Sequence, residues 1–270
     1  MADSPLNSHS LNVRRLVLAS SSPRRRELVE MLDLSLPVLI LPTHADETTP
    51  PGWTPAQIVE QLALRKARAA LPLLQDEPGH AADSVIIGAD TIVVLDGEAL
   101  GKPRDTAAAA AMLGRLQGRT HEVYSGLACI AVRGGSEQDR QIPAPNTRPP
   151  GQLTACGEET GEAAEWSGAG YRVVSRTENG MPEAVAGHTV SSVTFKTLSD
   201  EEIEGYAMTG EPLDKAGAYG IQGRGAIFVE RLEGDFYSVM GLPLHLLYRM
   251  LQLYDIRPFQ SKNDPNRSAK

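Results

Sequence analysis

The chain has 270 residues, 41% of them hydrophobic, and its 34 acidic residues against 26 Lys and Arg give a formal net charge of −8 at pH 7. A chain this acidic is poorly suited to nonspecific binding of nucleic acid or anionic membranes, so an anionic substrate needs local basic residues or a metal ion. Its two cysteines form no CxxC pair, no apolar run approaches membrane-spanning length and the start of the chain lacks a signal-peptide core, so we expect a cytoplasmic protein without disulfides or membrane spans.

The first regular element that the sequence predicts is a buried strand at residues 16–20. It follows a polar stretch, 1–13, that we expect to be a disordered tail. Ser22 and Pro23 then predict a helix with a serine N-cap and a proline in its first turn. Three arginines follow, and a helix N-terminus favours phosphate because its N–H groups are free and its dipole end is positive. The segment is either a phosphate site or an ordinary capped helix with solvated arginines.

A second strand is predicted at 36–41, and a capping box predicts the start of a second helix, 54–71. Lys66 continues the apolar stripe of Ile58 and Leu62 at intervals of four residues, which places the three side chains on one helix face. Lys66 therefore either points into a cleft or extends past the stripe into solvent.

The stretch around which the chain is organised is residues 85–105. It begins with an apolar run that predicts a strand buried on both faces, and Asp90 puts a carboxylate at or near the end of this strand. Asp96 and Gly97 predict a hairpin, because a type I′ turn needs positive φ at both central residues. The hairpin returns Lys102 toward the level of Asp90. A carboxylate and an ammonium facing one cleft can hold a metal-bound phosphate, but the same residues also fit a core strand with a solvated turn.

A third helix, capped by Asp105 and ending near Gly118, and a strand at 123–132 come next. Residues 134–188 differ from the rest of the chain, because they are rich in Pro, Gly, Glu and Thr and show little periodicity. We predict that they form a surface insertion, with room for a helix or strand of its own around 166–176.

After this insertion the sequence predicts a glycine-rich loop and four regular elements: a strand at 189–195, a helix at 199–208, the loop at 209–225, a strand at 226–232 and a helix at 243–254. Residues 257–270 are expected to form a second disordered tail. Because strands and helices alternate, we predict a single α/β domain over residues 14–256.

Common nucleotide-binding and hydrolytic motifs are defective or missing. Residues 97–103 are one residue short of a P-loop and carry proline where Ser or Thr is needed, and residues 220–225 have the wrong glycine spacing for a dinucleotide fingerprint. The six histidines lack zinc-ligand spacing and there is no GxSxG motif, which disfavours zinc-based and serine-based hydrolases.

What remains is a set of charged residues at the ends of predicted elements. Carboxylates and water suit Mg²⁺, which proteins usually bind through a few carboxylates and the phosphates of the substrate. Arginines and lysines can hold the remaining phosphate oxygens, and a free carboxylate can activate water. The set predicts Mg²⁺-assisted phosphoryl or nucleotidyl hydrolysis, and its members are Arg24, Arg25, Asp46, Glu47, Lys66, Asp90, Lys102, Asp214 and Lys215.

Four ordered motifs, at residues 18–28, 88–103, 211–223 and 234–243, resemble those of the Maf family of nucleotide pyrophosphatases. The resemblance implies an α/β fold like that of inosine triphosphatases, with a mixed twisted sheet, flanking helices and a cleft between two lobes. It also implies hydrolysis of a nucleoside triphosphate to the monophosphate and pyrophosphate with a divalent cation, Mg²⁺ or Mn²⁺, as a means of limiting aberrant nucleotides.

The resemblance also implies a role for individual residues. Asp90 falls on the proton acceptor, and Glu47, Asp90 and Asp214 fall on metal-binding positions. Positions linked to substrate choice are occupied by Arg24, Thr91 and Gln222, and Thr91 and Gln222 match the subgroup that resembles dTTP/UTP pyrophosphatases. Positions implicated in phosphate binding are occupied by Ser20, Arg25, Lys66, Lys102 and Lys215.

Two other functions compete with this one. A second subgroup of the family prefers 7-methylguanosine triphosphate, and a third reading is a nucleotide-binding regulator of cell division without turnover. The acidic net charge counts against a nucleic-acid partner, and the sequence is compatible with a homodimer as well as a monomer.

Overall fold

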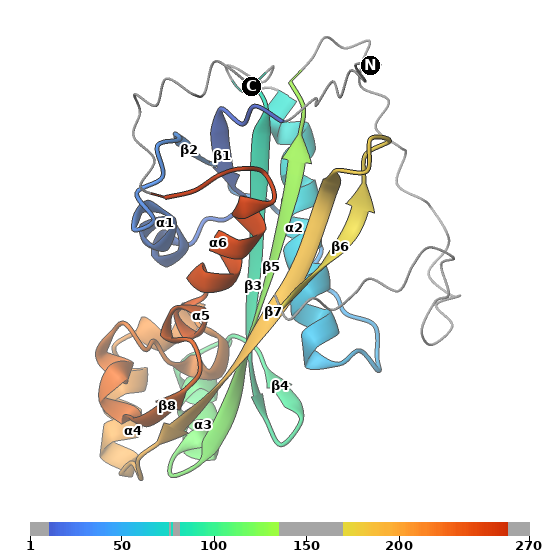
Figure 1. Ribbon diagram of the computed structural model, residues 1–270. Helices are drawn as coiled ribbons and strands as arrows, with labels where there is room; N and C mark the ends of the chain where they lie inside the picture. Colours follow the sequence, from blue (N-terminus) through green and yellow to red (C-terminus); the bar gives the residue numbers. More distant parts are fainter. Residues whose placement is uncertain (1–10, 76, 78–81, 135–169, 259–270) are drawn as a thin grey trace, which may run out of the picture.

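A single mixed sheet with helices on both faces forms the centre of the protein in a computed structural model (Figure 1). The structure describes residues 11–75, 77, 82–134 and 170–258. The outer parts of both predicted tails and residues 135–169 of the predicted insertion lie outside this range. Within it, no helix has the length and apolarity needed to cross a membrane.

The described part of the chain contributes eight strands to the sheet, in the order β2-β1-β3-β5-β7-β6, with β4 on β3 and β8 on β7. The pairs that β1 forms with β2 and β3 are parallel, and the others are antiparallel. The predicted mixed α/β fold is therefore confirmed. The strands are β1 (Arg15–Leu18), β2 (Val38–Ile40), β3 (Ser84–Leu95), β4 (Glu98–Leu100), β5 (Thr120–Val132), β6 (Tyr171–Arg176), β7 (Pro182–Phe195) and β8 (Val229–Glu233).

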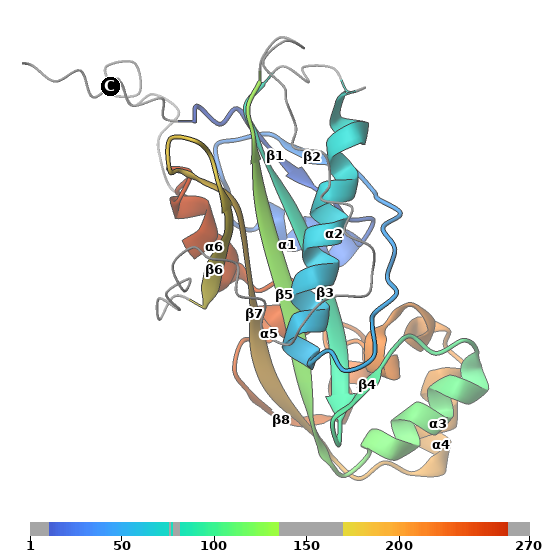
Figure 2. The same ribbon diagram turned by 90° about the vertical axis from the view of Figure 1, so that its right-hand side faces the viewer.

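The helices divide between the two faces of the sheet. Of the described helices, α2 (Pro55–Gln75) alone packs on one face, and α1, α5 and α6 lie over the other (Figure 2). A lower lobe holds α3 and α4 together with three short 3₁₀ helices. The bounds of these elements are α1 (Pro23–Glu30), α3 (Thr106–Leu116), α4 (Asp200–Ala207), η2 (Glu211–Asp214), η3 (Ala216–Ala218), η4 (Arg224–Phe228), α5 (Phe236–Met240) and α6 (Leu244–Gln252).

Alternate residues of β3 belong to two separate cores. Val85 and Ile87 join the larger core with α1, α3 and α6, and Ile86 joins the smaller core beneath α2. By the same alternation Asp90 points to the α2 face and Thr91 to the opposite face. Two adjacent polar side chains of β3 thus lie on opposite faces of the sheet.

Helix α2 lies unusually close to the sheet because two glycines make room for it. A Cβ on Gly88 of β3 would lie 2.2 Å from the carbonyl oxygen of Ala63, and one on Gly126 of β5 would lie 2.2 Å from that of Val59. Any side chain at these positions would therefore push the helix outward. This close approach brings Lys66, on the same helix, to the level of Asp90.

Several local predictions are confirmed. Ser22 caps α1 through a bond from the Arg25 backbone N–H, and the side chain of Asp105 caps α3. Both predicted capping boxes, at Thr54 and at Ser199, are present. The predicted hairpin joins β3 to β4, with positive φ at its two turn residues.

Other predictions were wrong in extent. Asp90 lies in the middle of β3 rather than near the end of a strand, because β3 continues to Leu95 and pairs with β5 along nearly all of its length. Helix α2 continues through Pro72 to Gln75, where burial of Leu74 holds its last turn. The expected strand at 226–232 begins only at Val229, after a 3₁₀ helix.

The bounds predicted for the insertion, 134–188, and for the N-terminal tail, 1–13, were also too wide. Residues 171–176 form β6, which confirms the regular element expected around 166–176, but the first half of β7 also falls in the predicted insertion, and Ala184–Gly187 of β7 pair with β5 in the central sheet. Their small side chains are buried by the sheet although they show no apolar–polar alternation. Val13, which we assigned to the tail, is buried in the larger core.

Candidate active site

A cleft of about 530 Å³ opens beside β3. Strand β1 pairs with β3 only as far as Ile87, and β4 pairs with it only from Val93, so no described strand covers this edge at residues 88–92. Asp90 and Thr91 both line the cleft although they point to opposite faces, because the cleft follows the open edge. A gap in the strand pairing thus positions the site.

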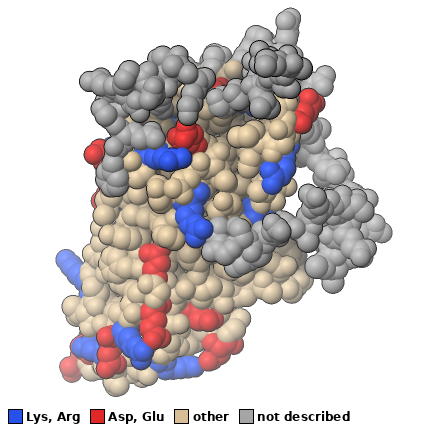
Figure 3. All heavy atoms as spheres, in the orientation of Figure 1, with Lys and Arg blue, Asp and Glu red and all other residues tan. Residues whose placement is uncertain are grey.

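All the site residues that the family resemblance implied line this cleft: Ser20, Arg24, Arg25, Glu47, Lys66, Asp90, Thr91, Lys102, Asp214, Lys215 and Gln222. Of the charged set, Asp46 alone is not in the lining; it accepts bonds from the backbone and hydroxyl of Thr48 in a local turn. On the molecular face of Figure 3, described basic and acidic side chains are interspersed rather than gathered in one basic patch.

Lys66 binds two carboxylates at once. Its Nζ lies 2.6 Å from Asp90 Oδ1 and 2.7 Å from Glu47 Oε1. Lys66 and Asp90 are largely buried, with side chains 15% and 10% exposed, and Glu47 is more open. The hydrogen bond from Lys66 holds the pKa of Glu47 below its ordinary value, against the opposing effect of burial. Of the two orientations left open for Lys66, the structure shows the one directed into the cleft.

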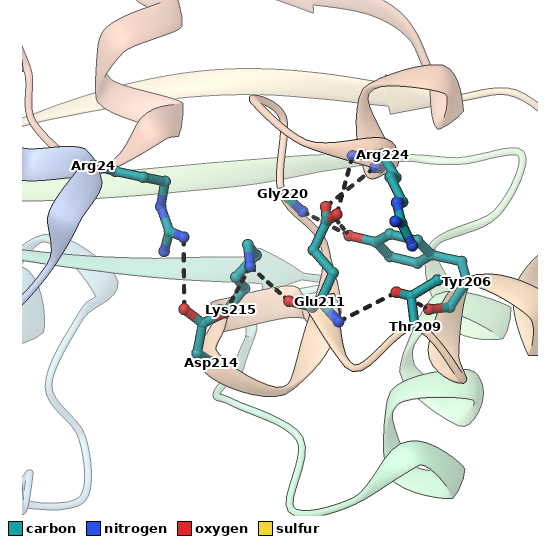
Figure 4. A network of polar contacts seen from close by, with 9 residues as sticks. Arg24, Tyr206, Thr209, Glu211, Asp214, Lys215, Gly220 and Arg224 are labelled. Carbon is teal, nitrogen blue, oxygen red and sulfur yellow. Dashed lines mark hydrogen bonds and ion pairs between the residues drawn. The ribbon is translucent and has the colours of Figure 1, made fainter. Parts of the chain in front are cut away.

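Asp214 lies in a second charged cluster, on the lower lobe (Figure 4). Its carboxylate is 2.6 Å from Lys215 Nζ and 3.6 Å from Arg24 Nη1. Burial raises the pKa of Asp214, but the bond from Lys215 and the charges of both cations outweigh it and hold the pKa below its ordinary value. Lys215 also donates to the backbone oxygen of Glu211.

The residues present fit a divalent metal only in part. Among the described residues, no group of three or more His, Cys, Asp and Glu could hold a metal ion. The predicted three-carboxylate set is therefore not assembled, since Asp214 pairs with Arg24 and Lys215, whereas Glu47 and Asp90 share Lys66. Mg²⁺ usually needs only one or two carboxylates with substrate phosphates, a set that Glu47 and Asp90 can supply.

Arg25 of α1 contacts two segments that are far apart in the sequence, one at Thr91 and the other at Gly241. Its Nε donates to the backbone oxygen of Gly241 at 2.8 Å, and its Nη2 lies 3.5 Å from Thr91 Oγ1. Burial lowers the pKa of the guanidinium, and the nearby carboxylate of Asp90 acts in the opposite direction. The first and last sequence motifs are thus joined beside the open edge of β3.

The remaining predicted residues, Ser20, Lys102 and Gln222, lie in loops. Ser20 Oγ accepts from the backbone N–H of Ser22 at 3.2 Å, which shapes the turn into α1. Gln222 Nε2 donates to Glu27 Oε2 of α1 at 3.2 Å. Lys102 follows the hairpin and reaches the same cleft as Asp90, as the sequence predicted.

Sequence reasoning missed the residue that holds the glycine-rich loop. Glu211 accepts from the hydroxyl of Tyr206 at 2.9 Å and from the backbone N–H of Arg224 at 3.2 Å, and Tyr206 in turn accepts from Gly220 (Figure 4). A Cβ on Gly223 would lie 2.2 Å from Glu211 Oε1, so any side chain there would displace this carboxylate from its present position. The available signal was an acidic residue at the start of a motif otherwise dominated by glycine.

Sequence reasoning also missed three buried serines behind the cleft, namely Ser125, Ser191 and Ser238. Ser125 and Ser191 lie in predicted strands, and Ser238 lies in the last motif. A polar residue at an inward-facing position was the signal that could have identified them.

Comparison with known proteins gives a consistent picture. The family model described as "Maf-like protein" matches residues 15–147 and 166–254. A dTTP/UTP pyrophosphatase of Moorella thermoacetica is 40% identical over 242 residues, which cover 90% of this chain and 96% of the relative. Those of Symbiobacterium thermophilum and Bacillus cytotoxicus are 40% and 38% identical, over 88% and 90% of this chain and 93% and 97% of the relatives. Only residues 148–165 interrupt the family match, well inside the predicted insertion.

Proposed function

Because the chain belongs to the Maf-like protein family, we propose that it hydrolyses dTTP and UTP to the nucleoside monophosphate and pyrophosphate. The observation that carries the proposal is the convergence of four separate motifs on one cleft, beside the open edge of β3. The named activity of the relatives supports the choice of substrates, since they cover about nine-tenths of the chain.

Asp90 is the residue that we assign to water activation. In the reaction a water oxygen bonds to one of the two phosphorus atoms of the α–β bridge, and the bond between that phosphorus and the bridging oxygen breaks. Asp90 takes the proton of the water, and its orientation is held by the bond from Lys66. General-base catalysis by a positioned carboxylate typically contributes on the order of 10²–10⁴-fold in rate.

The cations of the cleft bind the triphosphate. Lys102 follows the β3–β4 hairpin, Arg24 extends from α1, and Lys215 lies beside Asp214 on the lower lobe, where Asp214 pairs with both Arg24 and Lys215. Charge-assisted hydrogen bonds to phosphate oxygens are about twice as strong as neutral ones, so these residues fix the position of the scissile bridge. The short turn from Ser20 into α1 also lines the cleft and brings the N-terminus of this helix to it, and helix N-termini favour phosphate.

A divalent cation, Mg²⁺ or Mn²⁺, is part of the proposal, and Glu47 and Asp90 are the residues that would hold it. When bound, the ion supplies charge that neutralises the phosphates at the scissile bridge. Lys66 holds both carboxylates in the cleft, where phosphate oxygens of the substrate would complete the ligand set of the ion.

Gln222 is assigned to recognition of the base. Its amide provides one acceptor and two donors, one of which is already directed at Glu27, and the other donor can pair with a carbonyl of uracil or thymine. A mismatched base would leave amide groups unpaired, at a cost of about 1–3 kcal/mol. This chemistry favours dTTP and UTP over 7-methyl-GTP.

The test is a pyrophosphate-release assay with dTTP, UTP, CTP, ATP and 7-methyl-GTP, with Mg²⁺ or Mn²⁺ and with a chelator as control. We expect dTTP and UTP to have the highest kcat/KM, and Gln222→Ala to narrow their lead. Faster hydrolysis of 7-methyl-GTP would replace the substrate assignment with that of the other subgroup. Tight binding without turnover would support a nucleotide-binding regulator instead.

The setting of this activity is a further part of the proposal. The two cysteines of the chain suit a reducing cytoplasm, and the acidic net charge suits a small-molecule substrate rather than nucleic acid.

A further inference from the structure

A chain of buried hydroxyl groups runs behind Thr91. Ser125 of β5 stands directly opposite Thr91 of β3 in the strand register, and the two hydroxyl oxygens are 2.9 Å apart. Ser125 Oγ lies 2.6 Å from the backbone oxygen of Ser238, and both serines are fully buried. On its other side, Thr91 Oγ1 faces Arg25 Nη2 at 3.5 Å.

The donor and the acceptor of each hydrogen bond in this row of hydroxyl groups follow from the chemistry of its two ends. The carbonyl oxygen of Ser238 can only accept, so Ser125 donates its single proton there. Ser125 can then only accept from Thr91, so Thr91 is the donor and its single hydroxyl proton lies in that bond. Arg25 can only donate, so Thr91 accepts from it. Thr91 therefore has no proton left for the cleft that it lines, but it keeps one acceptor lone pair.

We propose that Ser125 is a positioning residue for substrate selectivity, because it fixes the Thr91 hydroxyl as an acceptor that reads an N–H donor on the base. This inference rests on the proposed function, and it names the chemical feature that the cleft selects. Uracil and thymine carry a proton on N3, whereas the N3 of cytosine is a bare acceptor. Two acceptors facing each other leave the Thr91 lone pair unsatisfied, so the cleft rejects cytosine.

Removal of Ser125 is the direct test. In Ser125→Ala, the Thr91 proton loses its buried acceptor and becomes free to rotate toward the cleft, where it can donate to N3 of CTP. We expect the ratio of kcat/KM for UTP to that for CTP to fall about tenfold, the effect of one hydrogen bond. The parent should also hydrolyse 3-methyl-UTP poorly, because this analogue lacks the N3 proton.

Ser191→Ala is the matched control. Ser191 is equally buried and its hydroxyl lies 3.0 Å from that of Ser238, but it does not contact Thr91. We expect Ser191→Ala to change stability without changing the UTP:CTP ratio. Ser125→Ala should also have no further effect on this ratio when added to Thr91→Val, because the acceptor is already gone.

An unchanged ratio in folded Ser125→Ala, or an equal change in Ser191→Ala, would overturn the inference and leave the proposed function intact. If Ser125→Ala does not fold, Thr91→Ser and Thr91→Val decide the matter, since only the first keeps the hydroxyl. Equal ratios in these two variants would overturn the inference. Failure of the parent to hydrolyse UTP at all would overturn the proposed function as well.

Discussion

Helix α2 carries two clusters of buried charge that look alike but lie in different surroundings. One is Lys66 with Glu47 and Asp90. In the other, Glu60 accepts from His188 Nδ1 at 2.7 Å and from Arg172 Nε at 3.1 Å. The central side chains are similarly buried, with Lys66 15% and Glu60 12% exposed.

The difference between the clusters is what lies beside them. Asp90 stands on an edge of β3 that no described strand covers, and it faces the cleft. Glu60 instead ties α2 to β6 and β7, two strands that are paired with each other, and none of its cluster is among the described residues that line the cleft. Burial and charge alone therefore do not make a site; what distinguishes the Lys66 cluster is the cleft that it lines beside residues 88–92 of β3.

Asp90→Asn should show the largest difference in kcat between a substitution in the Lys66 cluster and one in the Glu60 cluster. The amide cannot accept the proton of water, so we expect kcat for UTP to fall on the order of 10²–10⁴-fold, with an unchanged circular-dichroism spectrum. Glu60→Gln is the matched control in the other cluster and should keep the parent kcat. A folded Asp90→Asn variant with kcat within a few-fold of the parent would show that Asp90 is not the base.

Lys102→Ala should have the next largest effect. Loss of one charge-assisted phosphate contact is worth roughly 1.5–3 kcal/mol, so we expect kcat/KM to fall on the order of 10–10²-fold for UTP and dTTP alike. Lys196→Ala, which removes a lysine paired with Glu202 outside the cleft lining, should have no such effect. A changed ranking of bases in Lys102→Ala would argue against a phosphate role.

Glu60→Gln should affect stability rather than turnover. It weakens two bonds to a buried carboxylate, so we expect the free energy of unfolding to fall by about 1–3 kcal/mol in urea titrations. Glu30→Gln, in an exposed pair with Arg26, should cost much less stability than Glu60→Gln, because solvent screens the pair. Equal losses in the two variants would show that the Glu60 cluster adds nothing by being buried.

The Glu60 effect should also depend on pH. Burial raises the pKa of Glu60, but the bonds from His188 and Arg172 outweigh it and hold the pKa below its ordinary value. A carboxyl with a lowered pKa in the folded state stabilises the protein fully above its ordinary pKa, and this stabilisation is lost as the pH falls through the lowered value. The stability gap between the parent and Glu60→Gln should therefore narrow in acid.

The smallest effect is expected from the segment that the family match omits. Replacing residues 148–165 by a short Gly-Ser linker should leave kcat within about twofold of the parent, because loop length changes closure entropy only slowly. Removing all of 134–188, the insertion as first drawn from the sequence, should instead abolish folding, since it takes β6 and half of β7. Lost activity in a folded 148–165 variant would assign this segment a part in the site.

The sequence predicted local structure well where the signal was local. Ser22, Asp105 and Ser199 cap their helices as expected, because N-capping depends on a few adjacent residues. The first half of β7 was missed because it is rich in alanine and glycine, and its membership of the sheet depends on pairing with β5, far away in the chain.

For the site, too, the sequence predicted which residues take part but not the arrangement that depends on distant parts of the chain. Motif resemblance predicted residues of the cleft lining from Ser20 to Gln222, but not how they pair. That Asp214 joins Arg24 and Lys215 rather than Glu47 and Asp90 depends on how the loops of the lower lobe fold. The open edge of β3 and the proton order behind Thr91 are properties of strand register, which no single segment encodes.

In the proposed function, the cleft at Asp90 is where the α–β bridge of UTP and dTTP is cleaved. The most direct measurement is ³¹P NMR of the products formed from UTP by the parent and by Asp90→Asn. We predict UMP and pyrophosphate in equal amounts from the parent and almost no product from Asp90→Asn. The appearance of UDP and inorganic phosphate, or equal product from both proteins, would contradict the account.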